Sequence, residues 1–258
     1  MKHLIIVGAQ RCGSTLLYKM LDQHPEVMMS KPMRPEPKYF LEERDYSNRL
    51  EVYSEYIQKY YANPNQETKY FGEKSTSYLE SSVAATRICQ ILPEARILCI
   101  LRDPVLRAIS NYNFSFTNGL EKQDFQHAVS RSASDINRML NPMISVNPYN
   151  YIQRGFYVRY LRQYLKIIDR SQMKIILLES LVRHSELITD IYGWLGLGAK
   201  DIEYSLNQKV NASTIHTHVD AHLLESIGNT YIESIRDLAH EFNIDTSLWE
   251  SNPWYSNI

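Results

Sequence analysis

The feature that most constrains the fold is the stretch IIVGAQRCGSTLL, residues 5–17. It reads as an apolar strand, a turn of small and polar residues, and then a helix. Gly8 and Gly13 have the spacing of a phosphate-binding loop and Thr15 is in place, but Ser14 stands where that pattern has lysine. The stretch therefore predicts an α/β fold in which a strand–helix joint carries an anion site. Taken alone, it is also compatible with an ordinary strand–turn–helix connection.

A loop that leads into a helix can bind an anion through its own backbone, because several N–H groups point toward one place. Gly13 lets an oxyanion approach the backbone, and Ser14 and Thr15 add hydroxyl donors. Arg11 adds a planar fork of donors that can bind two oxygens of one anion. Without the usual lysine, a magnesium-dependent kinase is less favoured. The loop suits a donor with fewer charges on its transferring group.

Strand-like and helix-like patterns alternate along the chain. The apolar runs 3–9, 95–102 and 173–181 are followed by helical patterns at 14–24, 104–116 and 185–197. Continuous apolar strands between helices predict a central parallel sheet covered on both faces, with its site at the carboxyl ends of the strands. The alternation resumes after the irregular stretches 31–49 and 141–150. We therefore expect a single domain, residues 1–258, in which these stretches are excursions that shape a substrate pocket.

Composition narrows the class of protein. A chain of 258 residues with 44% hydrophobic residues can bury one sizeable core. A net charge of −1 gives no support to non-specific binding of nucleic acid or membranes. Cys12, Cys89 and Cys99 have neither a disulfide framework nor metal-ligand spacing, which indicates a reducing compartment. The first apolar run is too short for a signal peptide or a membrane span. We expect a soluble, cytoplasmic protein.

A second basic site follows another predicted strand, in ILCILRDPVLRAISNYNF, residues 97–114. Arg102 falls at the carboxyl end of the strand, where open α/β sheets bind ligands, and Pro104 suits the first helical position. Arg107 and Ser110 are three residues apart and so share a helix face. Alone, Arg102 would be read as a surface ion pair. Together with the first loop, it predicts a ligand with two separated phosphate-like groups.

The two motifs together, GAQRCGST and LRDPVLRAISNYNF, resemble the paired signature of sulfotransferases that use 3′-phosphoadenosine 5′-phosphosulfate (PAPS). The resemblance extends over about residues 3–215 and implies the P-loop NTPase-like architecture of that family. It implies that the first loop holds the 5′-phosphosulfate and that the second motif holds the 3′-phosphate. By position, the residues so assigned are Arg11, Cys12, Gly13, Ser14 and Thr15 in the loop, and Arg102 and Ser110 in the second motif.

A third segment, FGEKSTSYLES at 71–81, resembles the Glu-Lys-Ser/Thr segment of heparan-type and related bacterial sulfotransferases. The resemblance implies that Glu73 is the general base for the acceptor and that Lys74 lies near the reaction centre. Arg11 would stabilise the charge that develops on the leaving phosphate. Without the other motifs, Glu73 and Lys74 would be read as a solvated strand end.

Later segments add further candidates. Tyr157, in a helix–strand unit at 154–181, and the segment NQKVNAS, which resembles a loop that closes over the cosubstrate, give four cofactor-binding candidates: Tyr157, Lys209, Asn211 and Ser213. The segment HTHVDAH contains His216, His218 and His222, which could contribute to a metal site. No cysteine or carboxylate cluster completes that site, so no metal is predicted.

The resemblance implies transfer of a sulfuryl group from PAPS to a hydroxyl or amine, with 3′-phosphoadenosine 5′-phosphate (PAP) as product and no metal required. A compact chain without a strongly basic groove favours a polar small metabolite or natural product as acceptor. Sulfation of a carbohydrate or lipid headgroup is an alternative. A divergent P-loop kinase and a non-catalytic nucleotide-binding protein are the alternatives from other classes. Nineteen tyrosines do not define an oligomer interface.

Overall fold

The centre of the molecule is a five-stranded parallel sheet with the strand order β2-β3-β1-β4-β5. The computed structural model describes residues 1–131, 149–184, 186–200, 219–250 and 252–255. The strands are β1 Lys2–Gly8, β2 Val27–Met29, β3 Tyr70–Lys74, β4 Arg96–Leu101 and β5 Met173–Leu177. The predicted α/β fold with a central parallel sheet is confirmed.

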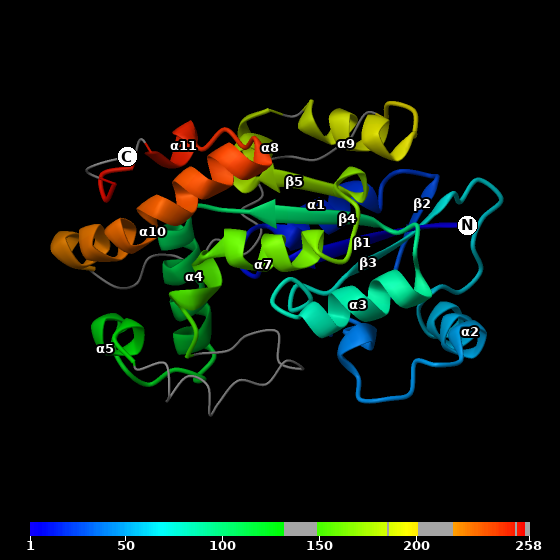
Figure 1. The fold of residues 1–258 in the computed structure, drawn as a ribbon, viewed down its shortest axis with the longest axis horizontal. Coiled ribbons are helices and arrows are strands. Elements are labelled where there is room, and N and C mark those ends of the chain that lie inside the picture. The colour runs from blue at the N-terminus through cyan, green and yellow to red at the C-terminus, as the bar shows by residue number, and fades with distance from the viewer. Residues whose placement is uncertain (132–148, 185, 201–218, 251, 256–258) are drawn as a thin grey trace.

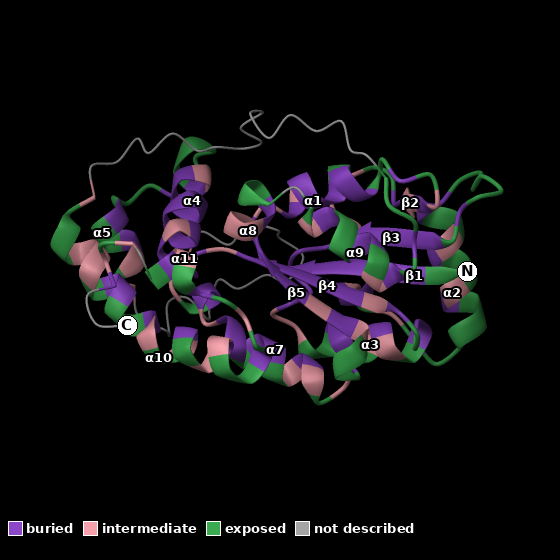
Figure 2. Cartoon of the chain, turned by 90° about the horizontal axis from the view of Figure 1, so that it is seen from above, coloured by how far each residue is buried: buried purple, intermediate pink, exposed green. Residues whose placement is uncertain are grey.

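Helices cover both faces of this sheet (Figure 1). The α-helices are α1 Ser14–Leu21, α2 Arg49–Tyr60, α3 Ser82–Ile91, α4 Pro104–Thr117, α5 Phe125–Val129, α7 Tyr157–Leu165, α8 Leu178–Arg183, α9 Leu187–Leu195, α10 Ala221–Phe242 and α11 Ser247–Glu250. Short 3₁₀ turns are η1 Tyr39–Leu41, η2 Gln153–Gly155 and η3 Arg170–Gln172. Figure 2 places α1, α8 and α9 on one face of the sheet and α3, α7 and α10 on the other.

The two hydrophobic cores explain why the central strands are apolar throughout. Ile5 and Val7 of β1 belong to the core on one face, and Leu4 and Ile6 belong to the core on the other. Successive strand side chains point to opposite faces, so a strand covered on both sides must be apolar at every position. This requirement produces the continuous apolar runs of the sequence.

The carboxyl ends of the central strands meet the starts of two helices. β1 continues through residues 9–13 into α1, and β4 leads into α4, which stands across the strand ends in Figure 1. Asp103 caps α4 by accepting a hydrogen bond from the Leu106 N–H (2.9 Å), and Pro104 occupies its first turn. The predicted anion motifs therefore lie at one edge of the sheet.

Three boundary predictions need correction. The helix predicted over 14–24 ends at Leu21. The strand predicted over 173–181 ends at Leu177, and α8 begins at the next residue. Leu178 and Leu181 are three residues apart, the spacing of one helix face, and Leu181 is fully buried. The helix predicted over 185–197 is α9, which is shorter at both ends.

Within the predicted excursion 31–49, the exposed ends enclose a part that packs inward. Residues 31–35 are mostly exposed, but Tyr39, Phe40, Leu41 and Tyr46 are buried in the core. Large aromatic side chains gain most by leaving water, so this segment packs inward despite its prolines. Most of the second predicted excursion, 141–150, lies outside the described residues.

Candidate functional site

The first loop presents a set of backbone donors at the start of α1. Gly13 has φ 84°, and a Cβ there would lie 2.5 Å from Leu178 Cδ1, so only glycine fits. Arg11 also has a positive φ, 65°. The backbone N–H groups of residues 11–15 donate to no acceptor among the described residues. Ser14 is buried and Thr15 half-buried in the first helical turn. Such a helix start is suited to an anion.

The Arg11 side chain joins this loop to α4. Its Nε donates to Ser110 Oγ (3.3 Å), and its guanidinium stacks over the Phe114 ring at 4.5 Å. The structure therefore brings together the two motifs that the sequence analysis paired.

Positive charge accumulates around Arg11, between the first loop and α4. Burial, and then the charges of Arg102 and Arg34, lower the pKa of Arg11 to about 10. No carboxylate among the described residues forms an ion pair with Arg11 or Arg102. A group of arginines without acidic partners favours an anionic ligand.

Cys12 and Tyr157 were both predicted to bind the cosubstrate, but their side chains are buried against the loop and the end of β4. The Tyr157 hydroxyl donates to the Arg102 carbonyl oxygen (2.8 Å) and lies 3.6 Å from Cys12 Sγ. Both side chains are buried, and burial raises the pKa of the Cys12 thiol to about 11, so it stays protonated at neutral pH. These side chains brace the loop and the end of β4. For Cys12, the backbone is the group able to face an anion.

The predicted catalytic pair on β3 is separated by the pleat of the strand, which sends neighbouring side chains to opposite faces. Glu73 is fully buried and accepts hydrogen bonds from Tyr56 Oη (2.7 Å) and Ser75 Oγ (2.6 Å). Burial raises the pKa of its carboxyl group. Lys74 instead forms an ion pair with Glu36, with 2.5 Å between Nζ and Oε1.

Glu36 is a candidate that the sequence analysis missed. Its carboxylate also accepts from the Thr76 backbone N–H (2.9 Å), and its side chain is 9% exposed. The neighbouring Ser77 hydroxyl accepts from Gln10 Nε2 (3.1 Å), which connects this region to the first loop. The signal in the sequence was a carboxylate between two prolines, whose fixed backbone presents Glu36 in one place.

Arg154 holds the start of the loop from the other side. It donates to Glu80 Oε2 and to Gln10 Oε1, both at 2.8 Å. Gln10 is thereby fixed between Arg154 and Ser77, directly before Arg11.

Comparison with known proteins agrees with this geometry. A model of the sulfotransferase domain matches residues 1–226. The chain belongs to the sulfotransferase domain family. The predicted resemblance is confirmed, and both paired motifs lie within the matched residues.

Relatives of this sulfotransferase-family chain include much longer proteins. The bifunctional heparan sulfate N-deacetylase/N-sulfotransferase 1 of Caenorhabditis briggsae is 26% identical over 252 residues, which are 93% of this chain and 28% of that protein. The human protein of the same name is 27% identical over 178 residues, 67% of this chain and 19% of that protein. The chain thus spans less than a third of either relative.

A crystal structure of a sulfotransferase from Alicyclobacillus acidocaldarius has a TM-score of 0.76 to this chain at 24% identity, covering 96% of this chain and 98% of the other. The sulfotransferase domain from the curacin biosynthetic pathway has a TM-score of 0.53 at 12% identity, covering 95% and 98%. These similarities show that the sulfotransferase fold extends over nearly the whole chain.

Several predicted residues lie outside the part of the chain that the structure describes: Lys209, Asn211, Ser213, His216 and His218. His222 lies in the exposed first turn of α10. Within the described residues there is no group of three or more His, Cys, Asp or Glu suited to a metal. Among the helices described, none combines the length and the apolar character needed to cross a bilayer.

The C-terminal residues pack against the second motif. Asp103 is fully buried, and its Oδ2 accepts from Asn252 Nδ2 (2.7 Å) and Trp254 Nε1 (3.3 Å). Its backbone N–H donates to Glu179 Oε1 (3.1 Å). Burial raises the pKa of the Asp103 carboxyl to about 6 despite these hydrogen bonds.

This environment predicts a pH-dependent stability. Because the folded state holds the Asp103 proton more tightly than the unfolded chain, the free energy of unfolding falls as pH rises from about 4 to about 6 and above. From pH 5 to 7 the loss due to Asp103 is roughly 1 kcal/mol. Urea unfolding at both pH values should show it in the wild type and not in Asp103→Asn. Asp245→Asn, at an exposed carboxylate, is the control with wild-type behaviour. Equal pH slopes in wild type and Asp103→Asn would contradict this assignment.

Proposed function

We propose that this chain transfers a sulfuryl group from PAPS to a hydroxyl or amine of an acceptor. The observation that carries the proposal is the contact of Arg11 with Ser110, which joins the two anion-binding motifs at one sheet edge. The donor has negative groups at two separate positions, and this edge offers a loop for one and Arg102 for the other. Membership of the sulfotransferase domain family supports the same reaction.

In this proposal, residues 11–15 bind the 5′-phosphosulfate through their backbone N–H groups, the Arg11 guanidinium, and the hydroxyls of Ser14 and Thr15. Arg102 and Ser110 bind the 3′-phosphate. Tyr157 acts indirectly, through its hydrogen bond to the Arg102 carbonyl. We keep Lys209, Asn211 and Ser213 as proposed contacts from a closing loop.

The proposed chemistry is an in-line displacement at sulfur. The acceptor oxygen or nitrogen forms a bond to sulfur, the bond from sulfur to the bridging phosphate oxygen breaks, and PAP leaves. Arg11 and the loop N–H groups stabilise the negative charge that develops on the bridging oxygen. Holding both substrates in line supplies a further part of the rate enhancement.

We assign the general base to Glu36. A base must come within hydrogen-bonding distance of the proton that it removes. Glu73, the residue predicted from the resemblance, has no exposed surface, and an acceptor would have to displace Tyr56 or Ser75 to reach it. Glu36 keeps some exposed surface. It also contacts Lys74, the residue predicted to lie near the reaction centre. Glu73 stays as the alternative base.

For the acceptor, we propose a polar small metabolite or natural product in the cytoplasm. The three cysteines are free, which fits a reducing compartment. A saccharide is the second candidate, favoured by relatives that are named heparan sulfate sulfotransferases. A screen of small alcohols, phenols, amines and glucosamine oligosaccharides with radiolabelled PAPS separates these classes.

Titration calorimetry tests donor binding without an acceptor. We expect PAP to bind in metal-free buffer more tightly than ATP with magnesium. Arg102→Ala should weaken PAP binding by about 10- to 100-fold, the effect of losing charge-assisted hydrogen bonds. Arg96→Ala is the matched control, since Arg96 begins the same strand at its opposite end and donates to the Ser171 carbonyl. A preference for ATP with magnesium would contradict the proposal and favour a divergent kinase.

A further inference from the structure

The proposed reaction leaves the buried Glu73 carboxylate without a role. Tyr56 donates to its Oε2 and Ser75 to its Oε1, and the Tyr78 hydroxyl lies close enough to interact with it electrostatically. A carboxylate in a dry interior is costly unless its oxygens are hydrogen-bonded. The hydroxyl groups of Tyr56, Ser75 and Tyr78 surround this carboxylate. Their other hydrogen bonds show which part of the chain the carboxylate holds in place.

Two of these hydroxyls connect Glu73 to the backbone of the segment 36–42, which carries Glu36. The Ser75 oxygen accepts from the Lys38 N–H (2.8 Å), and the Tyr78 oxygen accepts from the Phe40 N–H (3.1 Å). A hydroxyl has a single proton, so one that donates to Glu73 turns its lone pairs toward the backbone N–H groups. We call these two paths the hydroxyl relays.

The relays act close to Glu36. Lys38 lies two residues after it and has φ 51°, a conformation that a lysine keeps only when neighbouring contacts hold it. The ion-pair partner of Glu36, Lys74, is next to Glu73 on β3, and Thr76, next to Ser75, donates to Glu36. The same strand end therefore fixes the Glu36 carboxylate and the backbone that carries it.

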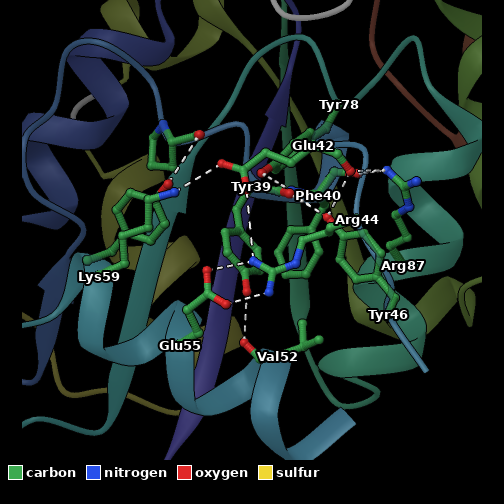
Figure 3. A network of polar contacts seen from close by, with 12 residues as sticks. Tyr39, Phe40, Glu42, Arg44, Tyr46, Val52, Glu55, Lys59, Tyr78 and Arg87 are labelled. Carbon is green, nitrogen blue, oxygen red and sulfur yellow. Dashed lines mark hydrogen bonds and ion pairs between the residues drawn. The ribbon is translucent and has the colours of Figure 1, made fainter. Parts of the chain in front are cut away.

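The rest of this segment is anchored independently on its outer side (Figure 3). Tyr39 Oη donates to the Val52 carbonyl (3.0 Å), and Arg87 Nη1 donates to the carbonyls of Phe40 and Glu42 (both 3.0 Å). These contacts attach the segment to α2 and α3 without involving Glu73. Loss of the relays is therefore expected to loosen residues 36–40 without releasing the whole segment.

We propose that Glu73 is a positioning residue: through Ser75 and Tyr78 it fixes the backbone at Lys38 and Phe40, and thereby the place of Glu36 beside Lys74. This inference rests on the proposed function, in which Glu36 is the base. It gives Glu73 a role that needs no contact with either substrate.

Glu73→Gln tests the relays with little change of shape. A glutamine has one acceptor oxygen and an NH₂ donor, so it cannot accept from Tyr56 on one atom and from Ser75 on the other, as the carboxylate does. We expect kcat to fall about 10- to 100-fold, as for a misplaced catalytic group, with the KM for PAPS and the affinity for PAP within about twofold of wild type. In a Glu36→Gln background, Glu73→Gln should cause no further loss. Tyr61→Phe is the control, because Tyr61 contacts Tyr56 but neither relay.

Amide hydrogen exchange supplies a readout that needs no acceptor. Glu73→Gln should speed exchange at both Lys38 and Phe40, and Ser75→Ala at Lys38 alone, with residues 4–8 of β1 unchanged. Unchanged exchange at these amides would overturn the inference. So would an equal loss of kcat in both backgrounds, or a loss of PAP affinity that matches the loss of kcat. A wild-type protein that transfers no sulfuryl group to any acceptor would contradict the proposed function instead, while exchange would still decide whether the relays exist.

Discussion

Glu36→Gln is expected to lower kcat for sulfuryl transfer by about 10²- to 10⁴-fold, the range for loss of a general base. The amide keeps the shape of the side chain and can still accept from the Thr76 N–H, but it cannot take up the acceptor proton. PAP affinity should stay near the wild-type value, because the donor-binding motifs are untouched. Initial rates with radiolabelled PAPS, at saturating acceptor from the screen, measure the effect.

Glu42→Gln is the matched control for this variant. Glu42 lies on the same segment and pairs with Lys59, with 3.0 Å between Lys59 Nζ and Glu42 Oε1. We expect it to keep wild-type activity. If Glu73→Gln abolished transfer while Glu36→Gln left kcat unchanged, Glu73 would be the base, as the sequence resemblance implied.

The contrast between these two carboxylates shows where sequence reasoning ends. The period-2 pleat alone predicts that Glu73 and Lys74 point to opposite faces, so that only one of them can face a given substrate. Which of them does so depends on what covers each face. Tyr56 of α2 closes over Glu73, and the segment that carries Glu36 supplies a partner for Lys74. The sequence of β3 itself carries no signal for either contact.

The fold was more accessible to prediction. Strands β1, β4 and β5 were found because burial on both faces demands uninterrupted apolar residues. β2 has only three residues, too few to show a pattern, and the polar end of β3 hides that strand. Both motifs follow strand ends, so the sequence predicts that they lie along the same edge of the sheet. The pairing of β1 with β4, which brings Arg11 into contact with Ser110, is seen only in the structure.

Arg11→Ala is expected to lower kcat by about 10²- to 10³-fold, the usual cost of removing a group that stabilises developing charge. The variant loses both the charge aimed at the leaving phosphate and the contacts with Ser110 and Phe114. Arg11→Lys retains the charge, so we expect it to keep activity within about tenfold of wild type, the lost donor fork being its main cost. Rates with PAPS for the three proteins test this order.

Arg34→Ala separates a local role of Arg11 from the general positive potential of the site. Arg34 is exposed and acts on Arg11 only through its charge. Its loss should therefore change kcat by less than about threefold, with an effect that fades as salt screens exposed charges. The Arg11→Ala effect should persist at high salt, because Arg11 is largely removed from water and contacts α4 directly. Equal rates for Arg11→Ala and Arg11→Lys would instead mean that the charge at this position contributes nothing, and that the loop N–H groups alone stabilise the leaving phosphate.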